Sequence, residues 1–209
     1  MKKRLIIIGA GSVGGFVAYN HEHLKSEYEL IGFLDDDVTK LDKILFNYPV
    51  LGTTNDIEKY IDCFFILGIA FPKIKDKIVA KLAKFNLNYI NYISPSAWIS
   101  NGVTIGNGVI IYPGVCINYE SNIKDFTTLN MNAVIGHNCL VDQFSTLAPG
   151  VCLAGHTSCL KGSDLGINSA TRQNAVIGEY AVLGGNAIAL KDINNNTVAV
   201  GVPAKEIIK

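Results

Sequence analysis

Two sets of residues in this 209-residue chain have types and a spacing that could do chemistry. The first is a histidine, His137, within an amide-rich segment from Asn130 to Cys139. An imidazole that titrates near neutrality can take a proton from an attacking amine or hydroxyl, and amides can hold a polar substrate. A second histidine, His156, follows nineteen residues later. The alternative for each histidine is an ordinary exposed surface position.

The second set is a glycine-rich turn, Gly9-x-Gly11-x-x-Gly14, with Asp35 and Asp36 about twenty residues further on. Such glycines let backbone amides approach phosphates at a helix N-terminus, and a carboxylate at the end of the next strand can hold a ribose. A purely structural tight turn is the alternative. Nothing after the second predicted strand completes a hydride-transfer site, which favours a nucleotide-type ligand over a redox cofactor.

These turns must be positioned by strands and helices, and the first ninety residues alternate between the two. Strands are predicted over residues 4–8, 29–34, 63–69 and 88–93, and helices from the glycine-rich turn to about Lys25, over 55–60 and over 72–85. This alternation indicates a small doubly wound α/β domain, assigned to residues 1–92. The domain is expected to be too short for a full six-stranded sheet.

From Ile93 to Ala189 an unbroken frame of six replaces that alternation. Every sixth residue is Ile, Leu or Val, except at Cys159, Thr171 and Ala189, and the residue four places after each of the first sixteen is small or Val. A period of six with one bulky and one small inward position predicts a parallel β-helix with eighteen residues in each coil. We assign residues 93–209 to this domain and its C-terminal tail, and the frame ends after Ala189.

Composition excludes several classes of function. Eighteen basic and eighteen acidic residues cancel, which argues against a nucleic-acid surface. No run of about eighteen uncharged apolar residues occurs, so we expect no membrane span, and the short apolar run after Met1 favours a cytoplasmic protein over a secreted one. The five cysteines show no paired metal spacing and are expected to be structural, with Cys139 and Cys159 facing inward.

The chain resembles the NeuD/PglD family of bacterial sugar acetyltransferases, which join a Rossmann-like domain to a left-handed β-helix. The resemblance covers nearly the whole chain, and it rests on Gly9–Gly15, Gly32–Asp37, Asn130–Cys139, Gly166–Ser169 and Gly201–Lys205. It implies transfer of acetyl from acetyl-CoA, without a metal, to the amine of a nucleotide-activated amino sugar of the 4-amino-4,6-dideoxyhexose type. It also implies a homotrimer that serves glycan or lipopolysaccharide biosynthesis.

The resemblance also implies roles for individual residues. His137 matches the general base, Asn130 a residue near the acceptor amine, and Gly155 a turn that meets the pantetheine arm of the coenzyme. Lys191 and Lys205, with Arg172, are candidates for its phosphates. The residues that match the nucleotide-binding positions are Gly9, Ala10, Gly11, Ser12, Gly14, Asp35 and Asp36.

Two departures from the family pattern bear on the site. The residue after the base is usually acidic in this family and is Asn138 here; it adds no charge, although its carbonyl could fix the tautomer of His137. We therefore expect Asn138→Asp to keep or increase turnover. Thr146 stands where the family often has a second histidine that contacts the coenzyme.

Other functions stay open at this point. O-acetylation of a sugar hydroxyl, of the sialic acid type, could use the same histidine. A metal-dependent, carbonic-anhydrase-like prism needs three protein ligands, whereas only His137 and His156 are available in the β-helix. The third alternative is an inactive nucleotide-sugar-binding scaffold.

Overall fold

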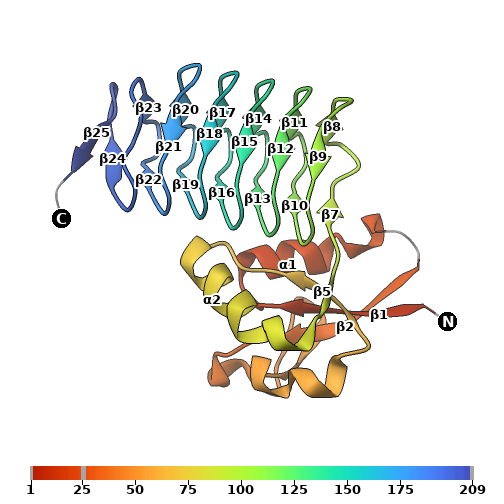
Figure 1. Cartoon of the computed structure of the whole chain (residues 1–209). Helices are drawn as coiled ribbons and strands as arrows, with labels where there is room; N and C mark the ends of the chain where they lie inside the picture. Colours follow the sequence, from red (N-terminus) through yellow and green to blue (C-terminus); the bar gives the residue numbers. More distant parts are fainter. Residues whose placement is uncertain (1, 25–26, 208–209) are drawn as a thin grey trace. The chain divides into compact units, whose positions relative to one another are not determined.

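The structure is a computed structural model in which residues 2–24 and 27–207 are described. The chain divides into two compact units, the first formed by Met1–Ala70 with Ile74–Tyr92 and the second by Phe71–Lys73 with Ile93–Lys209. We call them the N-terminal unit and the β-helix unit, and Figure 1 shows their elements.

The N-terminal unit is built on a six-stranded sheet of order β3-β4-β2-β1-β5-β6. All neighbours pair in parallel except β3 with β4. The strands, in sheet order, are β3 (Ile44–Leu45), β4 (Tyr48–Gly52), β2 (Tyr28–Leu34), β1 (Lys3–Ile8), β5 (Phe64–Leu67) and β6 (Asn88–Tyr89). The expectation that this domain is too short for six strands is wrong, because the two edge strands need only two residues each.

Helices connect these strands. They are α1 (Ser12–Tyr19) and α2 (Pro72–Leu82), with 3₁₀ helices η1 (His21–His23), η2 (Val38–Lys40), η3 (Thr54–Tyr60) and η4 (Ala83–Phe85). α1 ends earlier than predicted because the chain leaves helical geometry at Asn20 and tightens into η1. Lys25, where the sequence placed the end of this helix, lies outside the described residues.

The β-helix unit has three faces of stacked two-residue strands. The β8 face consists of β8 (Trp98–Ile99), β11 (Cys116–Ile117), β14 (Val134–Ile135), β17 (Cys152–Leu153), β20 (Ala170–Thr171) and β23 (Ile188–Ala189). The β9 face consists of β9 (Thr104–Ile105), β12 (Asn122–Ile123), β15 (Leu140–Val141), β18 (Ser158–Cys159) and β21 (Val176–Ile177).

The third face, the β7 face, is longer. Its strands are β7 (Tyr92–Ile93), β10 (Ile110–Ile111), β13 (Thr128–Leu129), β16 (Thr146–Leu147), β19 (Asp164–Leu165), β22 (Val182–Leu183), β24 (Val198–Val200) and β25 (Lys205–Ile207). Neighbouring strands from β7 to β22 pair in parallel eighteen residues apart, as Thr128 does with Thr146. β24 pairs with β22 sixteen residues apart, and β25 closes this face antiparallel to β24.

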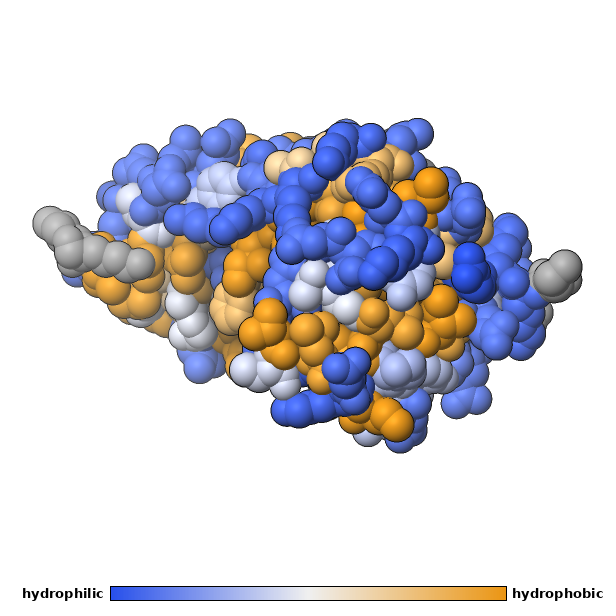
Figure 2. Space-filling model, turned by 90° about the horizontal axis from the view of Figure 1, so that it is seen from below, coloured by the Kyte–Doolittle hydropathy of each residue, from blue (hydrophilic) through white to orange (hydrophobic). Residues whose placement is uncertain are grey.

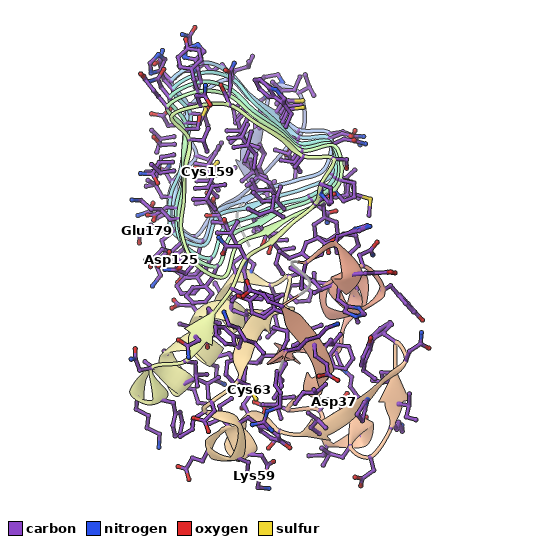
Figure 3. All side chains as sticks on the ribbon, turned by 90° about the vertical axis from the view of Figure 1, so that its right-hand side faces the viewer. Asp37, Lys59, Cys63, Asp125, Cys159 and Glu179 are labelled. Carbon is purple, nitrogen blue, oxygen red and sulfur yellow. The ribbon has the colours of Figure 1, made fainter. Side chains whose placement is uncertain are left out.

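The two inward positions of the six-residue frame fill the prism. Ile117, Leu147 and Leu165 are fully buried, and so are the small residues Ala133 and Ser163. Cys159 points into the triangular coil, whereas Asp125 and Glu179 lie outside it (Figure 3). Burial raises the pKa of the Cys159 thiol to about 12, which suits a structural side chain rather than a nucleophile.

The coil continues past Ala189, where the sequence showed the end of the frame. Ile193 bridges Ile177, and Ala199 pairs with Leu183, so the last coil is two residues shorter than the others. Both Ile193 and Ala199 are buried. Because one turn is two residues shorter, the last coil falls out of the six-residue frame in the sequence, although its inward positions are still filled.

Candidate active site

His137 lies on the edge of the prism where the chain turns from the β8 face to the β9 face. We call this the His137 edge; it comprises residues 100–103, 118–121, 136–139, 154–157, 172–175 and 190–192 of successive coils. The His137 side chain is half-buried. It is therefore both held by the protein and open to a substrate.

Two aromatic side chains hold the imidazole from neighbouring coils. Tyr119, one coil earlier, stacks on the ring with 5.2 Å between ring centroids and 11° between planes. His156, in the next coil, meets it edge-on with centroids 5.0 Å apart. Stacking and edge-to-face contacts both restrict ring rotation, so the plane of His137 is defined before any ligand arrives.

Gly155 leaves room for the reactive nitrogen of His137. A Cβ atom at this position would lie 2.7 Å from Nε2 and 2.8 Å from Cε1 of the imidazole. No side chain fits there without moving the ring. The sequence proposed Gly155 as a coenzyme contact, and the structure places it directly beside His137.

Asn138 and Glu120 determine which nitrogen of His137 carries the proton. Asn138 Nδ2 donates to Glu120 Oε2 at 2.7 Å, and Asn138 Oδ1 lies 2.9 Å from His137 Nδ1. A carboxylate only accepts, so it takes the NH₂ group of the amide and turns the amide oxygen toward the imidazole. His137 Nδ1 must then be the donor, and neutral His137 has its lone pair on Nε2.

Sequence reasoning missed Tyr119 and Glu120. Both lie eighteen residues, one full coil, before His137 and Asn138 respectively. That spacing stacks side chains on the same edge of the prism and could have identified both residues.

The other predicted residues of the β-helix unit fall in different places. Lys191 is on the His137 edge, three coils beyond His137, or about 14 Å at the usual spacing of strands. Asn130 lies on the edge between the β7 and β8 faces, where its Oδ1 accepts from the Met131 N–H at 2.8 Å. Thr146 is buried on β16, and Lys205 is exposed on β25. Within one copy, Asn130, Thr146 and Lys205 are therefore not on the His137 edge.

Arg172 also lies on the His137 edge, but its guanidinium already has partners. Nε donates to the Leu190 carbonyl and Nη1 to the Gln173 carbonyl, each at 2.8 Å, and Nη2 lies 3.5 Å from Asp192. These contacts tie the last coils of the edge together beside Lys191.

In the N-terminal unit, the glycine-rich turn brings β1 and α1 very close together. Gly9 adopts φ +101°, which L side chains rarely accept, and its N–H donates to the Leu34 carbonyl at 2.8 Å. A Cβ on Gly14 would lie 2.0 Å from the Gly9 carbonyl oxygen. Gly11, at the helix N-cap, has open space around its Cβ position, and Ser12 beside it is exposed.

We expect Gly14→Ala to destabilise the N-terminal unit by about 3 kcal/mol, since the new methyl group meets a backbone oxygen that cannot rotate away. Urea unfolding followed by helical circular dichroism measures this, because α1 and all but the first two residues of α2 lie in this unit. Gly11→Ala is the matched control and should leave the unfolding midpoint nearly unchanged. Equal unfolding midpoints for both variants would contradict the close approach of Gly14 to the Gly9 carbonyl.

The two predicted ribose-binding carboxylates both have partners within the unit. Asp35 accepts from the Ala10 N–H at 2.7 Å and from Lys40 Nζ at 2.9 Å, so it holds the glycine-rich turn. Asp36 accepts from the Thr54 N–H at 2.8 Å and lies 3.4 Å from Lys81 Nζ. Burial acts to raise the pKa of Asp36, but the Thr54 and Lys81 contacts outweigh it and lower that pKa. Both carboxylates are therefore already hydrogen-bonded to protein groups.

Among residues 2–24 and 27–207, no three His, Cys, Asp or Glu side chains are grouped so that they could hold a metal ion. None of their helices is both long and apolar enough to cross a bilayer.

Comparison with known proteins connects this geometry to a family. Residues 4–82 match the model of the PglD N-terminal domain. The acetyltransferase domain of PglB from Neisseria gonorrhoeae is 28% identical, with a TM-score of 0.90 over 99% of this chain and 100% of that one. A histidine-to-asparagine mutant of perosamine N-acetyltransferase from Caulobacter crescentus, in complex with CoA and GDP-perosamine, is 25% identical with a TM-score of 0.90, covering 98% of this chain and 97% of that one. WeeI from Acinetobacter baumannii AYE, at 22% identity and a TM-score of 0.86 over 99% of this chain and 100% of that one, shares the fold.

The fold class is confirmed as an α/β Rossmann-like domain followed by a left-handed parallel β-helix. The matches over nearly the whole length place the chain among acyltransferases with this fold. The resemblance to the NeuD/PglD-like family of sugar acetyltransferases that was noted in the sequence is confirmed.

Proposed function

We propose that the protein transfers the acetyl group of acetyl-CoA to the amine of a nucleotide-activated amino sugar of the 4-amino-4,6-dideoxyhexose type, for surface glycan biosynthesis. The observation that carries this proposal is His137, held in the tautomer whose Nε2 can accept a proton. Support also comes from relatives crystallised with acetyl coenzyme A, and with CoA and GDP-perosamine.

In the proposed reaction, the amine nitrogen attacks the thioester carbon while His137 Nε2 removes a proton from that nitrogen. A backbone N–H of a prism turn stabilises the developing oxyanion. The carbon–sulfur bond then breaks, an amide bond remains, and the thiolate of CoA takes the proton from His137. This route needs no metal and no covalent enzyme intermediate.

The coenzyme is proposed to lie along the His137 edge. Gly155 leaves space beside Nε2 for the thioester end, and Lys191 supplies a cation further along the same edge for phosphates. Lys205 is proposed to contact the coenzyme, and Asn130 the acceptor, each from a neighbouring copy. Thr146 is buried within its own copy and is not proposed as a coenzyme contact.

The nucleotide is proposed to bind the N-terminal unit at Gly9, Ala10, Gly11, Ser12 and Gly14. The exposed start of α1 offers unpaired helical N–H groups, which suit phosphate. Asp35 is proposed to shape this turn through its bond to Ala10, and Asp36 to order the neighbouring loop through Thr54.

A cytoplasmic homotrimer is the proposed assembly, and the outer surface of the β8 face supports contact between copies. Trp98 is 55% exposed and Val134 42% exposed, and Cys152 is exposed between them and Ala170. A flat, apolar strand surface of this kind is typical of an interface. Figure 2 shows hydrophobic clusters separated by hydrophilic residues on one side of the molecule.

A thermal-shift panel of UDP-, dTDP-, GDP- and CMP-linked 4-amino sugars tests the substrate class. A ligand at about 100 times its Kd stabilises the protein by about 2.7 kcal/mol, so the correct nucleotide should stand out. Gly11→Val should abolish that shift, because its side chain fills the open space at the helix N-terminus, while the shift with acetyl-CoA stays unchanged.

Product analysis by mass spectrometry completes this test. An alkali-stable amide on the amino-sugar nucleotide is expected. An alkali-labile ester on a sugar hydroxyl would replace the proposal with O-acetylation, and no acetyl transfer to any acceptor would identify a scaffold.

A further inference from the structure

Glu120, in the preceding coil, places a carboxylate within hydrogen-bond distance of the Asn138 amide. We propose that Glu120 is a positioning residue that acts through the Asn138 amide to keep His137 in its reactive tautomer. This inference rests on the proposed function, in which His137 is the base. It assigns to Glu120 the orienting role that an acidic residue beside the histidine would otherwise fill.

The Glu120 carboxylate determines which end of the Asn138 amide faces His137. Asn138 on its own could present either its oxygen or its NH₂ group to His137 Nδ1. Glu120 Oε2, 2.7 Å from Asn138 Nδ2, accepts only, so one orientation of the amide is selected. The Asn138 oxygen then faces Nδ1 at 2.9 Å. A carboxylate that does not touch the imidazole thus decides where its proton sits.

The backbone of the prism builds this alignment. Glu120 and Asn138 occupy the same turn position one coil apart, with φ of +56° and +55°. The Asn138 N–H donates to the Tyr119 carbonyl at 3.0 Å, which places the two turns in register. Both side chains therefore leave equivalent backbone positions, and the carboxylate meets the amide.

The exposure of Glu120 indicates which effect dominates. Its side chain is exposed, and the charge of an exposed group is strongly screened by water. The bond to Asn138 is charge-assisted and short, which makes it directional. Glu120 is therefore expected to act by orientation of the amide and of the His137 tautomer, and only weakly by its charge.

The test uses Glu120→Gln and Glu120→Leu in the full chain. Gln can accept from Asn138 through its oxygen but can also donate through its NH₂ group, so it selects the amide orientation only in part, and kcat should fall about 3-fold. Leu frees the amide to turn its NH₂ group toward Nδ1, which places the proton on Nε2, and kcat should fall about 10-fold or more with little change in KM. Glu179→Leu, on a different edge of the prism (Figure 3), is the matched control and should leave kcat unchanged.

Rescue separates positioning from simple damage. Adding Asn138→Asp to Glu120→Leu should restore most of kcat, because the new carboxylate accepts directly from His137 Nδ1–H. In the background that retains Glu120, Asn138→Asp brings two carboxylates together where a 2.7 Å hydrogen bond now lies. With Glu120 present, Asn138→Asp should therefore raise kcat less than it does in the Glu120→Leu background. Failure of the double variant to recover activity, with its thermal unfolding midpoint intact, would overturn the inference.

The imidazole ¹⁵N spectrum of ligand-free protein distinguishes this inference from the proposed function. A protonated Nδ1 and a bare Nε2 are expected for the native protein, a mixture of the two tautomers for Glu120→Gln, and a shift toward the opposite tautomer for Glu120→Leu. An unchanged tautomer in Glu120→Leu would contradict the proposed role of Glu120, whatever the kcat of that variant. Full turnover by His137→Asn would instead contradict the proposed function.

Discussion

His137→Asn is expected to lower kcat by two to four orders of magnitude, roughly the contribution of a well-placed general base. Asn has no nitrogen that can accept a proton from the amine, yet it is small and polar enough to leave the turn folded. Because the lost interaction forms only as the proton moves, kcat and kcat/KM should fall together. Steady-state kinetics with acetyl-CoA and the best amino-sugar nucleotide measures both.

The control for this prediction is His23→Asn, which makes the same chemical change in the N-terminal unit. His23 contacts Tyr92, with 3.5 Å between its Nδ1 and the Tyr92 hydroxyl, and its side chain is exposed. It should retain native turnover. If His137→Asn retained native turnover, as is expected for His23→Asn, another group would be the base and the His137 edge would not be the active site.

Gly155→Ala should lower kcat by about 100-fold although it changes no titratable group. The new methyl carbon would lie 2.7 Å from His137 Nε2, well inside van der Waals contact. The ring can move only by breaking its stack on Tyr119 or its bond to Asn138. A displacement of about 1 Å of a catalytic group can cost about two orders of magnitude in rate. The methyl group also occupies the space beside Nε2 that is proposed for the thioester end of the coenzyme.

Gly185→Ala is the matched control on another edge of the prism, where the nearest atom to the new methyl group would be 3.3 Å away. It should keep turnover within about 2-fold. Gly155→Ala should unfold at a lower temperature than Gly185→Ala, since only its methyl group must displace a neighbouring side chain, but it should remain folded at the assay temperature. Native kcat in Gly155→Ala would mean that the His137 ring can move aside despite its contacts with Tyr119 and Asn138.

The β-helix could be predicted from the sequence because each coil contacts only its neighbours along the axis. Inward positions then recur at a fixed interval, and the pattern from Ile93 to Ala189 shows them directly. The last coil was missed because its turn loses two residues while Ile193 and Ala199 still fill the interior.

The α/β unit was predicted less completely because its sheet order depends on contacts between distant segments. The hairpin of β3 and β4 gave no clear signal, since its two-residue turn places Phe46 at φ +49° and Asn47 at φ +70°. Phe is not a residue expected at a positive φ. Its ring packs near α1, where a Cβ on Gly15 would meet it, so tertiary packing accounts for the unusual conformation.

Sequence alone determined the eighteen-residue coil, the glycine-rich turn and His137 as the candidate base, because each depends on residue type at a short or periodic spacing. The tertiary structure decided what surrounds that base: the Tyr119 stack, the space at Gly155 and the bond from Asn138 to Glu120. It also showed that Asp35 and Asp36 bind protein groups first. The physical reason is that stacking brings residues one coil apart into contact, but side-chain torsions and hydrogen-bond direction select which of them pair.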